Sequence, residues 1–170
     1  MAANESSPGQ TITACGRLRS ITIKMRKSGS PRFNIRAKIY LDVPENWEVG
    51  FPLTNYVGQS TNVISAATLD ATFGDVTFLF NDIEVSGQWT VVFEYETITT
   101  HNQINYVLYA TGSMPPDGSI YAGGEFVYYN YDSDIWYTYP YGDMVFTCTF
   151  CEGECTTTTT EQIRGQEPIP

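Results

Sequence analysis

The sequence is poor in the residues on which most enzymes depend. It contains a single histidine, His101, which falls in a predicted turn and has no G-x-S-x-G motif near it. A lone histidine in a loop is usually a surface residue. The 19 acidic residues are scattered, so the sequence gives no reason to choose two of them as a hydrolytic pair. We therefore predict that the protein is not an enzyme.

Long apolar runs are also missing. No segment approaches the roughly 20 apolar residues that a membrane-spanning helix requires, so we expect no membrane insertion. The first residues, MAANE, do not resemble a secretory signal, which fits either a cytosolic product or a longer chain from which a leader was removed. Hydrophobic residues nevertheless make up 42% of the 170 residues, enough for one domain with a buried core.

Positive charge is scarce outside one segment. Eight of the nine Lys and Arg residues lie between Arg17 and Lys38, and the ninth is Arg164. From Ile39 onward there are 18 acids and one base, so this part carries 1 − 18 = −17. The whole chain has a formal net charge of −10. Such a surface repels phosphate, so nucleic acid could contact only the basic segment, if it binds at all.

The pattern that the sequence does contain is that of β-strands. Apolar and polar residues alternate over residues 21–26 and 33–43, as side chains do on the two faces of a strand. The turn-forming residues 27–31 (KSGSP) lie between these runs, so we predict that the two strands pair as a hairpin. Runs rich in Val, Ile, Phe, Tyr and Thr predict further strands over residues 75–80, 88–97, 103–110, 124–131 and 143–150.

These short strands and turns predict one all-β domain, an antiparallel β-sandwich or jelly-roll-like fold with little or no helix. The only helical pattern is a weak one over residues 61–69. We place the domain at residues 11–155, after a flexible N-terminal arm over residues 1–10. Residues 156–170 begin with a threonine run and end in proline, which is typical of a C-terminal arm or linker.

The predicted hairpin implies a basic surface. If its apolar side chains face the core, its basic side chains must point outward together. The side chains expected to face the core are Ile21, Ile23, Met25, Phe33, Ile35, Ala37, Ile39 and Leu41. Such a strip either keeps the strands from pairing with another molecule or contacts acidic groups on a neighbouring copy or on nucleic acid. We call it the basic strip, and its members are Lys24, Arg26, Arg36 and Lys38.

Aromatic residues are concentrated in the later part of the chain. Tyrosine and tryptophan rings stack on sugars or anchor protein interfaces, although alternation would place about half of them against the core. Trp136 and Tyr139 are our first choices for a sugar-binding surface. The full set of candidate binding residues is Tyr128, Trp136, Tyr137, Tyr139 and Tyr141.

Two further groups could hold a metal or form covalent bonds. Asp132 and Asp134 form a D-x-D pair, which occurs in calcium sites and also in plain turns; we expect no cofactor other than this candidate calcium. The four cysteines include a C-x₂-C pair, so disulfides, free thiols and a structural zinc are all open, in that order of preference. The cysteines are Cys15, Cys148, Cys151 and Cys155.

Two local resemblances bear on function. Residues 86–93 and 120–126, with the threonine run, are similar to cellulose-binding modules and their linkers. That resemblance implies binding through exposed tryptophans in a flat strip. Residues 124–134 resemble a strand and turn of the jelly-roll capsid proteins of small RNA viruses, which implies a subunit that assembles with others.

Two functional hypotheses follow. The favoured one is a non-enzymatic assembly protein of a virion, either a capsid-type subunit or a protruding surface domain. Its partners would be copies of itself or other structural subunits, held in part by opposite charges. The alternative is a secreted carbohydrate-binding module that holds a glycan on its tyrosine and tryptophan surface. The expected location is accordingly the virion surface or the extracellular space.

Overall fold

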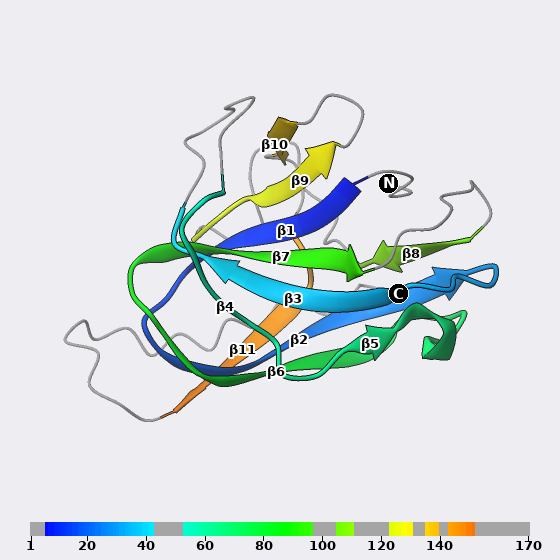
Figure 1. Ribbon diagram of the computed structural model, residues 1–170, viewed down its shortest axis with the longest axis horizontal. Helices are drawn as coiled ribbons and strands as arrows, with labels where there is room; N and C mark the ends of the chain where they lie inside the picture. Colours follow the sequence, from blue (N-terminus) through cyan, green and yellow to red (C-terminus); the bar gives the residue numbers. More distant parts are fainter. Residues whose placement is uncertain are drawn as a thin grey trace, which may run out of the picture.

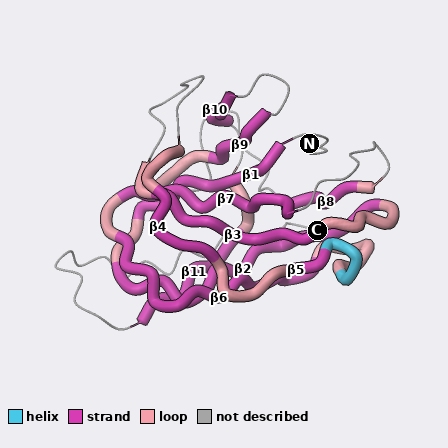
Figure 2. Tube along the Cα trace, viewed as in Figure 1, coloured by secondary structure: helices cyan, strands magenta, loops and turns pink. Residues whose placement is uncertain are grey.

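Two antiparallel β-sheets pack face to face in the computed structural model, with a shared hydrophobic core between them (Figure 1). The structure describes residues 6–42, 53–96, 105–110, 123–130, 135–139 and 143–151. Nearly all of its regular structure is strand (Figure 2). The predicted all-β antiparallel sandwich is therefore confirmed.

Within the described residues, sheet A contains seven strands and sheet B contains four. Sheet A has the order β10 (Ile135–Tyr139), β9 (Phe126–Asn130), β1 (Ser6–Thr13), β7 (Gln88–Glu96), β3 (Asn34–Tyr40) and β4 (Tyr56–Gln59), with β5 (Ile64–Ser65) also paired to β3. Sheet B has the order β11 (Phe146–Cys151), β2 (Gly16–Ser28) and β6 (Gly74–Val85), with β8 (Tyr106–Tyr109) paired to the end of β2. The window predicted as helical, residues 61–69, contains the short strand β5 and the 3₁₀-helix η1 (Ala66–Thr68).

The core follows the predicted alternation. Apolar residues on β2 and β3 point inward from the two sheets and are buried, and the aromatic residues of β6 and β7 fill the space between them. Phe78 and Phe93, for example, lie with their ring centroids 5.1 Å apart. Leu41 was expected to continue the inward pattern but is 38% exposed, because β3 ends one residue earlier. The residues predicted correctly as core are Ile21, Ile23, Met25, Ile35, Ala37 and Ile39.

The predicted hairpin is wrong. Strand β2 belongs to sheet B, where it pairs with β6, β8 and β11, whereas β3 belongs to sheet A and pairs with β4, β5 and β7. The turn after Ser28 carries the chain from one sheet to the other, and Gly29 has a φ of 68° there. Alternation shows that a strand has one buried face. It does not distinguish a neighbour in the same sheet from a strand that faces it across the core.

The ordered fold also begins earlier than predicted. Strand β1 starts at Ser6, so residues 6–10, which we assigned to a flexible arm, lie in the middle of sheet A between β7 and β9. This strand was not predicted because it contains Pro8 and Gly9, and proline and glycine are depleted in strands. Residues 1–5 and the predicted C-terminal arm, residues 156–170, lie outside the described residues.

A side chain protects one edge of sheet B. The Asn62 amide donates a hydrogen bond from Nδ2 to the Thr77 carbonyl (2.9 Å), and its Oδ1 accepts one from the Leu79 N–H (2.8 Å). The backbone N–H of Thr61 also donates to the Leu79 carbonyl (2.7 Å). Asn62 thus takes the place of a neighbouring strand and satisfies backbone groups that the edge strand β6 would otherwise expose.

Candidate functional site

The basic strip does not form one surface. Lys24 and Arg26 point outward from sheet B, while Arg36 and Lys38 point outward from sheet A, on the opposite side of the sandwich. The prediction failed because it depended on the hairpin. Strands on two facing sheets that turn their apolar side chains toward each other turn their polar side chains in opposite directions.

The same basic residues are already paired within the molecule. Lys24 Nζ lies 2.9 Å from Asp75 Oδ1, and Lys38 Nζ lies 2.5 Å from Glu94 Oε2. The other two members are also engaged, because Arg36 Nε lies 2.5 Å from Glu96 Oε1 and the Arg26 guanidinium lies 5.1 Å from the centroid of the Phe73 ring. The acids of β6 and β7 therefore neutralise three of the four bases.

The candidate aromatic residues separate onto two faces of sheet A. Tyr128 and Tyr137 lie on the core side, with their rings stacked at a centroid distance of 5.2 Å, and Tyr128 packs against the core. Trp136, one residue before Tyr137, lies on the outer face of the sheet. Tyr141 and the side chain of Tyr139 lie outside the described residues. Of the predicted binding set, Trp136 is thus the ring that the structure places at an outward-facing site.

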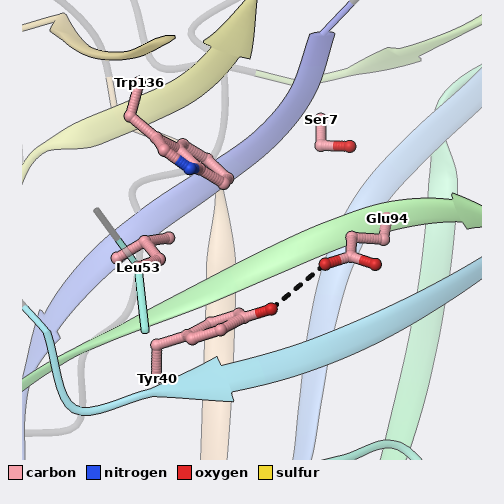
Figure 3. A pocket seen from close by; sticks show the side chains of 5 residues that line it. All are labelled: Ser7, Tyr40, Leu53, Glu94 and Trp136. Atoms are coloured by element: carbon pink, nitrogen blue, oxygen red, sulfur yellow. Dashed lines mark hydrogen bonds between the residues drawn. The ribbon is translucent and has the colours of Figure 1, made fainter. Parts of the chain in front are cut away.

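An open hollow of about 200 Å³ lies on the outer face of sheet A (Figure 3). Four neighbouring or nearby strands of the sheet each contribute one side chain, and the segment before β4 contributes a leucine. These five side chains surround an open centre in Figure 3. The residues that line it are Ser7 of β1, Tyr40 of β3, Leu53, Glu94 of β7 and Trp136 of β10.

Strand alternation explains why these side chains meet. On β7, Phe93 and Tyr95 are buried in the core, so Glu94 between them points outward. On β3, Ile39 points into the core and Tyr40 points outward in the same way. The two strands are adjacent in sheet A, which brings the Tyr40 hydroxyl within 3.1 Å of Glu94 Oε1.

A close approach between strands covers the adjoining part of the face. Val92 of β7 and Val127 of β9 both pair with Gly9 of β1, and both valines are fully buried although they point away from the core. A Cβ atom on Gly9 would lie 2.8 Å from Val127 Cγ2 and 2.5 Å from the Val91 carbonyl oxygen. Gly9 therefore permits Val127 to pack over β1, and the row beside the hollow is shielded from solvent.

Glu94 is held in place by β3. Its Oε2 accepts a bond from Lys38 Nζ at 2.5 Å, and its Oε1 accepts one from the Tyr40 hydroxyl at 3.1 Å. Burial, with the nearby Glu94 charge as the second cause, raises the pKa of Tyr40 well above its ordinary value. The Tyr40 hydroxyl consequently stays protonated and remains a donor. Each Glu94 oxygen has a second lone pair with which it can accept a hydrogen bond from a ligand.

The cysteines have three different outcomes. Cys15 is disulfide-bonded, Cys148 and Cys151 are free, and Cys155 lies outside the described residues. Cys148 packs against the core, and burial raises its pKa to about 12. The Cys151 thiol lies on the other face of β11. Since these two thiols diverge, the C-x₂-C pair does not form the zinc half-site that we left open, and the described residues contain no cluster of three or more metal ligands.

Cys151 lies in a polar group of three side chains that the sequence did not predict. Its Sγ accepts a bond from Arg19 Nε (2.5 Å) and donates one to Asp82 Oδ1 (2.9 Å), and Arg19 also pairs with Asp82 (3.1 Å). At Arg19 the register of β2 shifts against both of its neighbours, β11 and β6. Asp82 has a φ of 52°, a left-handed conformation that aspartate tolerates. Arg19 and Asp82 are exposed to solvent, which screens their charges, and Cys151 is partly buried. The single histidine, His101, lies outside the described residues, and so do the candidate calcium ligands Asp132 and Asp134.

A buried amide joins β1 to the segment before β11. Gln10 Nε2 donates to Asp143 Oδ1 (2.8 Å), and Gln10 Oε1 accepts a bond from the Met144 N–H (3.0 Å). Glu125 lies near this group, and its Oε2 is buried without a hydrogen-bond partner among the described residues. Burial and then the Asp143 charge raise the pKa of Glu125.

The hollow also contains residues that sequence analysis did not select. Trp136 was selected, but Ser7, Tyr40, Leu53 and Glu94 were not. A usable signal was present for Tyr40, since a tyrosine at the outward position of a strand is an amphipathic ring placed at the surface. Its meeting with Glu94 and Trp136 could not be read from the sequence, because it depends on the order of the strands.

Comparison with known proteins gives no further assignment. The chain matches no family model, no curated protein and no solved structure. Among the described residues there is no helix with the length and apolar character needed to cross a membrane. The interpretation of the hollow therefore depends on its own geometry and chemistry.

Proposed function

We propose that this protein is a carbohydrate-binding module that holds a sugar in the hollow on sheet A and catalyses no reaction. The observation that carries the proposal is the combination of the Trp136 ring with the fixed Glu94 carboxylate around one open centre (Figure 3). Aromatic rings pack against the apolar C–H faces of sugars. Carboxylate and hydroxyl groups at the rim then bind the sugar hydroxyls and fix their orientation.

The size of the hollow fits a small ligand. Its volume of about 200 Å³ lies below the roughly 300–1,000 Å³ of sites for drug-sized molecules, which leaves room for about one sugar ring. Ser7, Tyr40 and Glu94 are carried by strands of a single sheet rather than by loops. A site that is already formed loses less conformational entropy on binding, so more of the contact energy remains as affinity even when the contact area is small.

The acidic residue in the hollow supports binding rather than cleavage. Glu94 is the single carboxylate among the described residues that line it. Most glycoside hydrolases use two carboxylates on either side of the bond that they break. Both Glu94 oxygens are also engaged by Lys38 and Tyr40, an arrangement suited to a fixed hydrogen-bond acceptor.

The disulfide at Cys15 supports a location outside the cytosol. Disulfides persist in oxidising compartments and are rare where glutathione keeps thiols reduced. An extracellular location is therefore part of the proposal. Mass spectrometry of the natural protein, alkylated before lysis, would detect the disulfide; a fully reduced Cys15 would contradict this location.

A glycan array with the purified protein tests the proposed function. We expect the protein to retain at least one class of glycan, and Trp136→Ala to weaken that binding by about fivefold or more, because the lost stacking is worth about 1 kcal/mol or more. Phe73→Ala is the control, since Phe73 is an exposed ring that lies outside the hollow. An array without any bound glycan, or equal binding by Trp136→Ala, would refute the proposal.

A structural assembly protein, such as a capsid-type subunit or a protruding domain on a virion surface, is the second candidate. The observation that favours it is a group of exposed apolar side chains at the β3–β4 edge of sheet A: Leu41, Tyr56 and Val57. Exposed apolar groups at a sheet edge are a common place for contact between chains. Because the basic strip is paired internally, such a contact would be apolar rather than ionic.

Light scattering coupled to size exclusion tests this second candidate. The assembly proposal expects a discrete oligomer that persists when the salt concentration is raised, since apolar contacts are not screened. Val57→Asp should convert that oligomer to a monomer. A monomer at every protein concentration would remove assembly through this edge.

A further inference from the structure

We infer that the hollow selects neutral sugars and rejects acidic ones, with Glu94 as the residue that sets this preference. The inference rests on the proposed carbohydrate-binding function and names its ligand class. An acidic sugar carries a carboxylate of its own, so its binding depends on a cation that is free to meet it. The question is therefore whether the described residues around the hollow include a cation that has no carboxylate partner.

The cation beside the hollow is Lys38, and Glu94 already neutralises it. The two charged groups lie 2.5 Å apart, and their side chains are only 29% and 31% exposed. A half-buried ion pair is screened less by water than one on an open surface. A sugar carboxylate would have to break or share this pair before it gained anything from Lys38.

The next cation along β3 is engaged in the same way. Arg36 Nε lies 2.5 Å from Glu96 Oε1, and Arg36 Nη1 donates to the Ser60 carbonyl at 3.0 Å. Both bases on this part of sheet A therefore have a carboxylate partner. The chain as a whole carries a net charge of −10, which adds a general repulsion against acidic polymers.

A neutral sugar meets none of these costs. Its hydroxyl groups donate hydrogen bonds to Glu94, and a hydrogen bond to an ionised acceptor is roughly twice as strong as one between neutral groups. Lys38 and Tyr40 fix the carboxylate from β3, so little ordering of Glu94 is needed on binding. The negative charge that repels an acidic sugar thus strengthens the binding of a neutral one.

The neighbouring ion pair supplies a matched control for the experiment. Glu94→Gln removes one negative charge from the hollow, keeps the shape of the side chain and releases the Lys38 ammonium. Glu96→Gln removes the same charge from the same face of β7, but Glu96 pairs with Arg36 and does not line the hollow. The two variants therefore separate a local effect of Glu94 from a general effect of net charge.

The test is isothermal titration with homo-hexasaccharides of glucose, mannose and galactose and with the corresponding uronic-acid hexasaccharides. For the unaltered protein we expect the best neutral probe to bind at least tenfold more tightly than its uronic counterpart. Glu94→Gln should weaken the neutral probe by about fivefold and strengthen the uronic one, so that their ratio falls by tenfold or more. Glu96→Gln should leave the ratio within twofold.

The results separate the two proposals. If the unaltered protein binds the uronic probes as tightly as the neutral ones, the inference is overturned and the carbohydrate-binding function stands. If it binds none of the probes and no glycan on the array, the function itself is refuted. Should Glu94→Gln fail to fold, Lys38→Gln serves instead: it should retain the preference for neutral probes, and loss of that preference would overturn the inference.

Discussion

The outer faces of the two sheets follow the same alternation of side chains but form different surfaces. On sheet A, Val92 and Val127 are fully buried, and the hollow opens beside them. On sheet B, Leu79 is 49% exposed, and Thr22 and Thr77 share a hydrogen bond (2.8 Å) at the open surface. A period-2 pattern identifies the outer face of a strand, but it does not show whether that face is covered.

The ion pair on the outer face of sheet A is also less exposed to water than the one on sheet B. Lys38 and Glu94 on sheet A are 29% and 31% exposed, whereas Lys24 and Asp75 on sheet B are 34% and 65% exposed. The chemical groups are nearly identical, so the difference in water contact decides their strength. The outer face of sheet A is therefore partly shielded from water, whereas that of sheet B is solvated.

The sharpest test of this difference uses two glycines. An alanine Cβ at Gly9 would lie 2.5 Å from a backbone oxygen, whereas one at Gly74 of sheet B would meet nothing within 4 Å. We expect Gly9→Ala to lower the free energy of unfolding by about 3 kcal/mol or more, because backbone must move. Gly74→Ala should change it by less than about 0.5 kcal/mol. Urea unfolding followed by tryptophan fluorescence measures both, and equal effects would contradict the close approach at Gly9.

A second pair of variants tests the apolar side chains on the two faces. Val92→Ala removes two buried methyl groups, so we expect a loss of about 2 kcal/mol in the free energy of unfolding. Leu79→Ala removes more atoms, but they are half in water, and the expected change is within about 0.5 kcal/mol. Thermal unfolding ranks the two variants. A larger effect for Leu79→Ala would show that the outer face of sheet B is covered.

Glu125 provides a test that depends on pH. Its folded-state pKa is raised, so the folded state favours the protonated carboxyl and loses stability as pH rises through that pKa. We expect Glu125→Gln to raise the melting temperature at pH 7 and to leave it nearly unchanged at pH 4, where the carboxyl is largely neutral in both states. Glu94→Gln, in which the lost charge had a partner, should not share this gain. A gain for Glu125→Gln that is equal at both pH values would contradict the raised pKa.

The smallest expected effects come from the ion pairs themselves. Lys38→Met leaves the half-buried Glu94 without its cation, and we expect a loss of about 1 kcal/mol in the free energy of unfolding. Lys24→Met should cost about 0.5 kcal/mol or less, since Asp75 is well solvated. Repeating the measurements in about 1 M salt should reduce the first difference and nearly abolish the second. An equal cost for both variants would show that the pairs experience the same environment.

The sequence was sufficient to predict local features of the fold. Alternation identified the inward side chains of β2 and β3, because burial on one face is a property of the strand alone. Ile23 on β2 and Ile35, Ala37 and Ile39 on β3 are all buried as predicted. Alternation could not supply the partner of each strand, so the hairpin and the basic strip that depended on it were wrong.

The candidate site was predictable only in part. Trp136 could be selected because a tryptophan in an alternating, aromatic-rich segment is an amphipathic ring suited to a surface. Tyr40 and Glu94 lie 54 residues apart in the chain, and their contact exists because β3 and β7 are neighbours in sheet A. Strand β1, which separates β7 from β9, was itself hidden by Pro8 and Gly9. Sheet order is a property of the whole fold, and no local pattern contains it.

The central position of β1 has a consequence for how the protein is made. This earliest of the described strands completes its pairing only with β7 and β9, and Gly9 meets Val92 and Val127 there. At about 5–20 residues per second, a ribosome needs roughly 5 to 25 seconds to produce those partners. Until then β1 remains an unpaired strand, open to association with other nascent chains. The speed of translation and the presence of chaperones should therefore govern how much of the protein reaches the sandwich.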